Sequence, residues 1–594
     1  MGRHNFHDLQ QFIDHLEAIG DLKRITAEVD PILEITEIAS RVIEEGGPAL
    51  IFENVKGAAF PMAINLFGTM ERVNLALGRE PREVGEELVY LFEKVNPPSF
   101  KSFSTILPKA YDLLSMRTKN LRSGFSQQVE EQPNLSRLPI MQCWPEDGGR
   151  FITLGLVLTN DPVTKRRNLG IYRMQVYDDK TTGMHWHPHK GGAAHYHEAA
   201  KLGQDLDVAV VLGGDPKMIF TAIAPLPDGM DELAFASYLR GKPIPMVQGK
   251  SVNLKVPANA EFIIEGTVPQ GVLREEGPFG DHFGYYSMQA DFPVFNVSEI
   301  TRRLLPVFPA TIVGKPPKED IFLGIAAGEM FSPLIKIIQP EVKRMWAYPE
   351  AGFHNLLVVS VDERYPKNGI KAMLALWGTG QLLLTKCMIM VSSDVDPTDF
   401  SAVLTEIGEN FYAKEDFLLI PWAPLDTLDF TSGKLNVGSK MGINAVRKPH
   451  TSGRKKSPVP TSVPNPKEKH KEILDYKLLP GGILVLKITD QKEPKKVLEK
   501  MFKTPGYKDV RIMILQSKDI DLNNQTELIW GMFTRFDPYL DVIFEHTELR
   551  GSAVIYDGRM GIDATYKNSY PNVIEMSSNI KQKVSKRWKD YWKQ

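Results

Sequence analysis

Acidic side chains flank a turn in Glu275-Glu276-Gly277-Pro278-Phe279-Gly280-Asp281, the stretch with the clearest capacity for chemistry. Because glycine and proline exclude a helix here, Glu276 and Asp281 can face one cavity. Arg173, which follows Asn168-Leu169-Gly170-Ile171-Tyr172, supplies a guanidinium that could bridge them. A buried Glu/Arg/Asp network of this kind sets the proton donors of a catalytic site. The alternative is a surface turn whose charges remain in water.

Histidines crowd a second stretch, in which five of the 13 lie between His185 and His197. On a strand, His185, His187 and His189 would point to one face and could bind zinc or iron. Pro188 interrupts such a strand, so a polar loop with incidental histidines is the alternative. A third hypothesis combines one histidine with Asn168 and Glu232, an oxygen-rich set that suits Mn²⁺ or Mg²⁺ and could tie down a phosphate.

The composition restricts the class of protein. The chain has 594 residues, 42% of them hydrophobic, and a formal net charge of -2, so it has material for several domain cores but lacks the basic excess of a nucleic-acid binder. Its only cysteines are Cys143 and Cys387, too few for a disulfide framework. No signal peptide and no run of roughly 18 apolar residues is visible. We expect a soluble cytoplasmic protein with at most peripheral contact with the inner membrane.

The elements that must position these side chains fall into successive domains. Helical periodicity in Leu9–Ile19 and Ile35–Val42, followed by the strand-like 49–52, predicts an N-terminal α/β lobe over 1–125. Short runs rich in β-branched and aromatic residues, among them 151–158, 170–177 and 217–222, predict a β-barrel domain over 126–313.

The remainder of the chain resembles itself. Alternating strands and helices predict an α/β domain over 314–448, a Pro/Ser/Lys-rich linker over 449–470, and a second copy of the α/β domain over 471–575. The clearest match sets Gly438-Ser439-Lys440-Met441-Gly442 against Asp557-Gly558-Arg559-Met560-Gly561, so Arg559 replaces Lys440. Residues 576–594 predict an amphipathic helix, which packs on protein or else contacts a membrane.

Several motifs in order resemble those of one enzyme family. They are NLGIYRMQ (168–175), PHKGG (188–192), PLPDGMDE (225–232), VPANAEFIIEG (256–266), EEGPFGDHFGYY (275–286) and GSKMGINA (438–445). The chain resembles the UbiD family of reversible, prenylated-FMN-dependent decarboxylases, and LPIMQCWPEDGG (138–149) resembles its quinone-pathway branch. The duplicated C-terminal domain resembles the long form among menaquinone-pathway members. The resemblance implies that the central domain is a flavin-reductase-like split barrel.

The resemblance also implies roles for residues of this chain. Arg173, Glu276 and Asp281 would form the catalytic network, with Asp281 as the proton donor. Asn168, His189 and Glu232 would bind Mn²⁺, and a K⁺ ion could lie near Ala222 and Glu232. The cofactor-binding residues would be Asn168, Gly170, Ile171, Tyr172, Arg173, His189 and Lys440, with Lys440 or its counterpart Arg559 at the cofactor phosphate.

The expected reaction is decarboxylation of a hydroxybenzoate or naphthoate acid, polyprenylated, in menaquinone or ubiquinone biosynthesis. Loss of CO₂ from an sp² carbon needs a cofactor as electron sink. A flavin prenyltransferase would supply that cofactor, and a homo-oligomer is expected. The alternatives are unprenylated hydroxyaryl or α,β-unsaturated acids, carboxylation in the reverse direction, a split-barrel flavin oxidoreductase and a zinc hydrolase; the second C-terminal copy could serve assembly alone.

Overall fold

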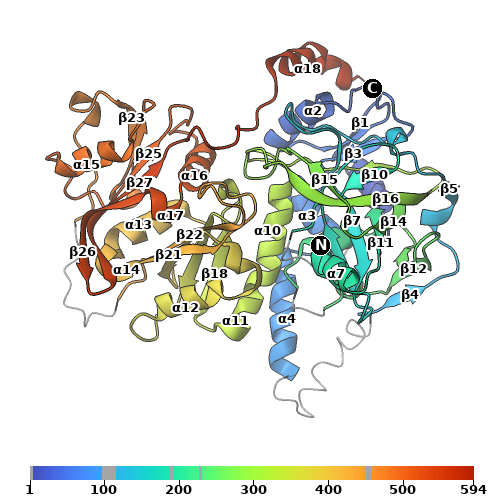
Figure 1. Ribbon diagram of the computed structural model, residues 1–594, viewed down its shortest axis with the longest axis horizontal. Coiled ribbons are helices and arrows are strands. Elements are labelled where there is room, and N and C mark those ends of the chain that lie inside the picture. Colours follow the sequence, from blue (N-terminus) through green and yellow to red (C-terminus); the bar gives the residue numbers. More distant parts are fainter. Residues whose placement is uncertain (1–4, 96–114, 188–190, 227–229, 449–457, 594) are drawn as a thin grey trace. The chain divides into compact units, whose positions relative to one another are not determined.

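The computed structural model describes residues 5–95, 115–187, 191–226, 230–448 and 458–593, and the chain divides into two compact units (Figure 1). The first unit comprises Met1–Met330 together with Asn572–Gln594, and the second comprises Phe331–Pro571. The architecture is mixed α/β throughout, as the sequence predicts. The last 23 residues of the chain therefore belong to the same unit as the first 330.

A four-stranded sheet organises the N-terminal lobe of the first unit, in the order β1-β2-β3-β17. Its elements are α1 (Leu9–Ala18), β1 (Leu22–Ile25), α2 (Glu34–Glu44), β2 (Ala49–Phe52), β3 (Met62–Ile64), α3 (Met70–Leu77), α4 (Pro81–Val95) and β17 (Phe308–Pro309). Helix α1 begins where the Asp8 side chain caps it by accepting from Gln11 N at 3.0 Å. Its apolar stripe, which the helical periodicity predicts, is buried in the lobe.

An eight-stranded sheet forms the centre of the first unit, with the path β10-β16-β14-β11-β7-β8 and with β15 and β5 paired to β16. The strands are β5 (Val129–Glu131), β7 (Leu156–Asn160), β8 (Arg167–Ile171), β10 (Thr181–Gly183), β11 (Leu206–Leu212), β14 (Phe262–Val268), β15 (Leu273–Glu276) and β16 (Ala290–Arg302). Helices α7 (Gly191–Lys201), α8 (Lys217–Ile223) and α9 (Glu232–Arg240) accompany it. Smaller sheets join β13 (Lys255–Pro257), β12 (Ile244–Gln248) and β4 (Thr118–Asn120), and β6 (Phe151–Ile152) with β9 (Met174–Gln175).

One prediction about this region is wrong, and the structure decides between the two alternatives for the histidines that it describes. Residues 217–222, predicted as a strand, form helix α8, which begins after Pro216 where Asp215 accepts the Lys217 N–H at 3.0 Å; a short apolar run carries no periodicity that separates the two structures. His185 and His187 lie beyond the end of β10 at Gly183 and not on a strand.

The second unit contains two five-stranded sheets with the same strand order. The first is β18 (Val342–Ala347), β19 (Leu356–Val361), β20 (Cys387–Ser392), β22 (Val437–Asn444) and β21 (Phe417–Pro424). The second is β23 (Ile473–Leu479), β24 (Ile483–Ile488), β25 (Ile512–Gln516), β27 (Ala553–Ala564) and β26 (Val542–Arg550). Cys387 pairs with Met441 in the first sheet as Ile512 pairs with Met560 in the second, so Lys440 and Arg559 occupy equivalent positions.

Helices accompany both sheets of this unit. They are α12 (Asn368–Trp377), α13 (Phe400–Asn410) and α14 (Ala413–Asp416) in the first half, and α15 (Lys495–Lys503), α16 (Gln525–Thr534) and α17 (Pro538–Asp541) in the second. Strand β19 and helix α12 are examples of the alternation that the sequence predicts over 314–448. Cys387 in this unit and Cys143 in the other are both buried free thiols.

A continuous helical stretch, Asp320–Ile338, includes α10 (Asp320–Phe331) and α11 (Ile335–Ile338). By length and composition alone it is apolar enough to cross a membrane, and 39% of its most apolar window is buried. The stretch is not an uninterrupted apolar run, because Asp320, Glu329 and Lys336 lie within it, so it does not contradict the sequence prediction. A core helix of a soluble protein passes the same test.

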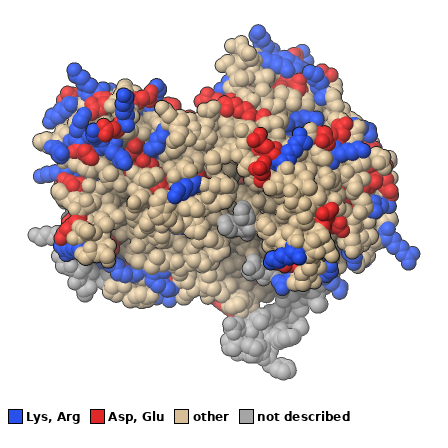
Figure 2. Space-filling view, in the orientation of Figure 1, with Lys and Arg blue, Asp and Glu red and all other residues tan. Residues whose placement is uncertain are grey.

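The final helix, α18 (Ser578–Tyr591), packs on α2 of the same unit (Figure 1). Val584 and Tyr591 are fully buried there. Of the two readings of this amphipathic segment, the structure shows packing on its own chain. Elsewhere on the surface, basic and acidic side chains are interspersed on the face that Figure 2 shows, in agreement with a net charge near zero.

Candidate functional site

Arg173 links the two carboxylates that the sequence analysis pairs. Its Nε donates to Glu276 Oε1 at 3.1 Å, and its Nη1 donates to Asp281 Oδ2 at 2.5 Å. Nη2 donates to the Ser287 hydroxyl at 3.0 Å, and the guanidinium lies 4.8 Å from the centroid of the Phe279 ring. The side chains of Arg173 and Glu276 are 7% and 0% exposed. The network is therefore buried, and the surface-turn alternative does not describe it.

Asp281 is the member of this network nearest to solvent, with 14% of its side chain exposed. Its Oδ1 accepts from the backbone N–H of His282 at 2.8 Å and lies 2.9 Å from His282 Nδ1. Desolvation raises the pKa of Asp281, but the hydrogen bonds from His282 and the charge of Arg173 outweigh it and hold this pKa well below its usual range. Asp281 is therefore ionised in the ligand-free protein.

His185 is a second partner of Glu276, because its Nδ1 makes a short contact with Glu276 Oε2. Its ring lies 4.1 Å from that of Phe292 and 5.0 Å from that of His187. Burial and the nearby Arg173 lower the pKa of His185, although Glu276 opposes them. Desolvation raises the pKa of Glu276, but Arg173 and His185 more than offset it, so the net pKa is lowered. His185 is thus a second partner that keeps the Glu276 carboxylate ionised.

The turn between the two acids is held by side chains from other elements. Asp147 Oδ1 accepts the Gly280 N–H at 2.8 Å, and its Oδ2 accepts from the backbone of Cys143 and Trp144. Gln175 Oε1 accepts the Gly277 N–H at 2.8 Å. A Cβ at Gly280 would lie 2.3 Å from Trp144 Cδ1, so only glycine fits there. These contacts fix where Asp281 points.

Asn168, near the start of strand β8, and Glu232 form a second part of the site. Glu232, the first residue of α9, accepts the Leu169 N–H at 3.1 Å. Burial raises the pKa of Glu232 to about 7, and Asn168 Nδ2 is buried and has no hydrogen-bond partner among the described residues. A Cβ at Gly191 would lie 2.1 Å from Asn168 Oδ1, so a glycine leaves the space beside the amide. The amide oxygen of Asn168 and the carboxylate of Glu232 are oxygen ligands of the kind that Mn²⁺ or Mg²⁺ takes, and a cation there would neutralise the buried carboxylate.

The histidines that the sequence analysis proposes as metal ligands are only partly described by the structure. His189, the third predicted ligand, lies outside the described residues. Within the part of the chain that the structure describes, no three His, Cys, Asp or Glu side chains are grouped to hold a metal. Because Glu276 engages Nδ1 of His185, only Nε2 of that ring is open to ligate a metal.

The segment between Asn168 and Arg173 connects the two ends of the site. Gly170 and Ile171 lie on β8, paired with Val157 and Leu156 of β7. A Cβ at Gly170 would meet the Tyr172 ring at 2.7 Å, so glycine lets that ring fold back on the strand. Tyr172 is buried, and desolvation raises its pKa to about 12. It therefore stays a neutral phenol.

Lys440 belongs to the second unit. Its Nζ donates to the carbonyls of Leu383 at 2.5 Å and Thr385 at 2.9 Å, and burial lowers its pKa to about 7. Its equivalent Arg559 pairs with Glu545 at 2.5 Å. Both side chains are engaged within their own unit.

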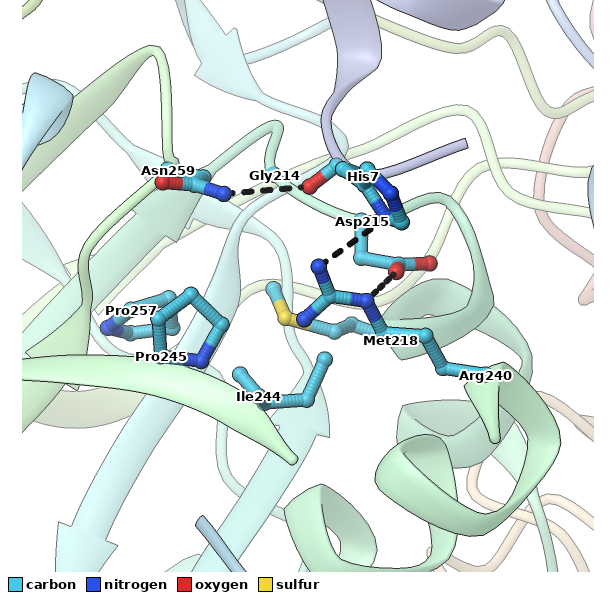
Figure 3. Close-up of a pocket in the computed structure, with 9 residues that line it drawn as sticks. All are labelled: His7, Gly214, Asp215, Met218, Arg240, Ile244, Pro245, Pro257 and Asn259. Carbon is cyan, nitrogen blue, oxygen red and sulfur yellow. Dashed lines mark hydrogen bonds and ion pairs between the residues drawn. The ribbon is translucent and has the colours of Figure 1, made fainter. Parts of the chain in front are cut away.

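A separate small cavity borders His7, Asp215 and Arg240 (Figure 3). Arg240 forms a 3.3 Å ion pair with Asp215 and lies 3.0 Å from His7 Nδ1, and Asn259 donates to the His7 carbonyl at 3.2 Å. With about 10 Å³, the cavity has room for one water molecule at most. The contacts around the cavity hold His7 in place, and the cavity itself is too small for an organic substrate.

Comparison with protein families explains this combination of fold and site. The N-terminal, Rift-related and C-terminal domain models of 3-octaprenyl-4-hydroxybenzoate carboxy-lyase match residues 13–92, 117–316, and 321–445 with 463–564, respectively. The protein is accordingly an enzyme of the carboxy-lyase class, a decarboxylase. It belongs to the UbiD family.

Uncharacterised relatives extend over most of the chain. A protein of Archaeoglobus fulgidus is 42% identical over 445 residues, which cover 75% of this chain and 92% of its own. A protein of Chlamydia trachomatis is 38% identical over 591 residues, 98% of this chain and 99% of its own. At this coverage the latter match includes the second five-stranded sheet.

Solved structures show the same architecture. The UbiD-class enzyme HmfF from Pelotomaculum thermopropionicum, in complex with FMN, is 26% identical with a TM-score of 0.63, covering 76% of this chain and 97% of its own. Vanillic acid decarboxylase from Sedimentibacter hydroxybenzoicus, in closed form, is 23% identical with a TM-score of 0.68, covering 84% and 99%. The second likeness concerns the fold alone.

Sequence reasoning missed three contributors to the site. His282 is part of the motif that carries Asp281, and its position next to that acid was an available signal. Asp147 lies in the 138–149 motif. Its hydrogen bond with Gly280 joins residues 133 positions apart in the chain, so no local sequence pattern indicates it. His185 was considered only as a metal ligand.

Proposed function

We propose that this enzyme catalyses the non-oxidative, reversible decarboxylation of a polyprenylated hydroxybenzoate or naphthoate acid in menaquinone or ubiquinone biosynthesis, with prenylated FMN and Mn²⁺. The observation that carries the proposal is the buried bridge from Arg173 to Glu276 and Asp281 in a chain of the UbiD family. Octaprenyl-hydroxybenzoate in the family's description supports the substrate class. We further propose a cytoplasmic homo-oligomer that receives its cofactor from a flavin prenyltransferase.

Prenylated FMN, when bound, supplies the electron sink that loss of CO₂ from an sp² carbon requires. Residues of the 168–173 segment would hold it, and Asn168, Glu232 and His189 would hold the Mn²⁺ that ties down its phosphate. The desolvated carboxyl of Glu232, which contacts the strand that carries Asn168, supports this assignment. Lys440 or Arg559 at the phosphate and K⁺ near Ala222 and Glu232 stay predictions.

Asp281 would deliver the proton that replaces CO₂ on the substrate carbon. Since Arg173 and His282 hold Asp281 ionised at rest, a proton must reach its carboxylate before each delivery. The His282 ring touches Asp281 Oδ1 and is 26% exposed, so it offers the path from solvent. Arg173 keeps the two carboxylates aligned, and its three nitrogens already have protein partners.

The central domain would be a split barrel, and the second five-stranded sheet a duplicated C-terminal domain with a structural or oligomeric role. The shared strand order of the two sheets supports the duplication.

The test uses protein co-expressed with a flavin prenyltransferase and acids labelled with ¹³C in the carboxyl group. We expect the wild-type enzyme to release ¹³CO₂ from a polyprenylated hydroxybenzoate or a hydroxynaphthoate. The Asp281→Asn variant should release none from the same acid. Release only from unprenylated acids would replace the substrate class. No release from any acid by flavin-loaded protein, together with hydride transfer from a nicotinamide, would favour the oxidoreductase.

A further inference from the structure

The chain returns to the first unit after Pro571 and pairs with the hairpin that carries Asp281. Ile574 N donates to the Gly284 carbonyl at 2.9 Å, and Tyr286 N donates to the Asn572 carbonyl at 3.2 Å. Between them, Tyr285 and Val573 form an antiparallel bridge. We name residues 572–594 the C-terminal strap.

The hairpin itself places Asp281 directly opposite the residue that the strap binds. Asp281 N donates to the Tyr285 carbonyl at 3.2 Å, and Gly280 and Tyr286 form an antiparallel bridge. Asp281, Tyr285 and Val573 therefore follow one another across three adjacent segments. Displacement of the strap would free the outer edge of the hairpin, one segment away from the acid.

This hairpin needs outside support to keep one conformation. Gly277 and Gly284 have φ values of 101° and 83°, and glycines in such a loop lose much conformational entropy when the loop is ordered. The strap supplies part of the compensation through its two backbone hydrogen bonds. Asn572 Nδ2 adds a link to both carboxylate oxygens of Glu146, at 3.1 and 3.0 Å, next to the residue whose side chain holds Gly280.

Helix α18 anchors the strap through a buried carboxylate of the N-terminal lobe. Glu34, 1% exposed in its side chain, accepts from Lys583 at 2.9 Å, from Arg587 at 2.5 Å and from the Tyr591 hydroxyl at 2.7 Å. Apolar contacts reinforce this anchor, because Ile574, Met576, Val584 and Tyr591 are buried in the core of the unit. A buried carboxylate with two cations fixes the helix, since losing them would leave its charge uncompensated.

We infer that the C-terminal strap is a positioning element for the Asp281 hairpin. Its catalytic consequence rests on the proposed function, whereas its effect on hairpin order does not. The strap touches no reacting atom. It acts through Tyr285 and Gly284, and its anchor lies in a different part of the unit from the acid.

The first test removes the anchor and leaves the pairing residues intact. Lys583→Ala combined with Arg587→Ala is compared with Lys586→Ala combined with Lys589→Ala, two exposed lysines of the same helix. Hydrogen exchange of peptides covering 279–287 is measured on the full chain without substrate. We expect exchange roughly tenfold faster in the first variant and unchanged in the control.

The second test breaks the pairing itself. Ile574→Pro removes the N–H that donates to Gly284, whereas Glu575→Pro alters an exposed residue whose N–H makes no hydrogen bond within the described residues. We expect only Ile574→Pro to deprotect 279–287. In the cofactor-loaded enzyme it should lower kcat by roughly tenfold with KM and flavin content little changed, because misplacement of an acid slows chemistry more than binding.

Wild-type exchange at 279–287 in both test variants would overturn the inference, as would faster exchange with an unchanged kcat. A wild-type enzyme that decarboxylates no acid would instead contradict the proposed function, and the exchange experiment would still decide whether the strap orders the hairpin.

Discussion

Arg173 Nη1 lies 2.5 Å from Asp281 Oδ2, while Nε of the same guanidinium lies 3.1 Å from Glu276 Oε1. One planar cation thus fixes two carboxylates in a space from which water is largely excluded. Arginine is suited to this because its donors form a rigid planar fork that spans both acids, whereas a lysine ammonium is a single compact charge on a flexible stem.

Arg173→Lys should therefore keep the positive charge but lose the planar bridge between Glu276 and Asp281. We expect decarboxylation to fall by about 100-fold or more, the scale of a lost acid–base contribution, with prenylated FMN still bound. Steady-state rates and flavin content measure both effects, and Arg166→Lys, at an exposed position, is the control. A rate within about twofold of wild type would show that the bridge is dispensable.

Asp281→Asn should change how stability depends on pH. Because the folded-state pKa of Asp281 is lowered from 3.8, its contribution is present above about pH 4 and is lost as pH falls through the folded value. We expect the variant to be less stable than wild type by about 1–3 kcal/mol at pH 7, with a smaller difference at pH 3.5. Urea unfolding measures this, with Asp291→Asn, an exposed position, as control. An equal difference at both pH values would contradict the ion pair.

His282→Gln should slow proton supply to Asp281 without displacing the cofactor. We expect kcat to fall by about tenfold or more and imidazole in the buffer to restore part of it, because a small base can replace a missing proton carrier. The exposed His197→Gln is the matched control. Failure of imidazole to raise the rate, together with an unchanged Asp281 environment, would assign His282 a packing role only.

Glu232→Gln should abolish metal retention. Replacing the carboxylate removes the only charged oxygen ligand among the described candidates, so bound manganese should fall from about one per chain to below about a tenth. Elemental analysis after gel filtration measures it, with Glu198→Gln on α7 as control. Full manganese in Glu232→Gln would move the site elsewhere.

Burial of Lys440 should make the stability of the second unit depend on pH. Burial lowers its pKa from 10.5 to about 7, so the unfolded chain binds the extra proton between these values and stability should rise with pH across that window. In the wild-type protein this rise should amount to about 2–4 °C in Tm. Lys440→Met should abolish the rise, whereas Lys414→Met should leave it unchanged. Identical pH profiles for Lys440→Met and wild type would show that the lysine is charged and paired in the folded protein.

Local patterns in the sequence predict much of this structure, and long-range pairings account for what they miss. Helix α1 follows from its apolar spacing, and the residue types around one turn single out Glu276 and Asp281. Their contact with Arg173, which is 103 and 108 residues away in the chain, depends on the tertiary fold. By contrast, residues 217–222 are apolar without a period, so tertiary context decided in favour of a helix. The pairing of Val573 with Tyr285 joins backbones 288 residues apart, and backbone hydrogen bonds leave no mark on side-chain identity.

The most direct test of the central claim is the absorbance and mass spectrum of the protein co-expressed with a flavin prenyltransferase, taken together with its metal content. Prenylated FMN and manganese, each near one per chain, are the predicted result. Colourless protein with stoichiometric zinc would contradict the account and direct attention to His185, His187 and His189.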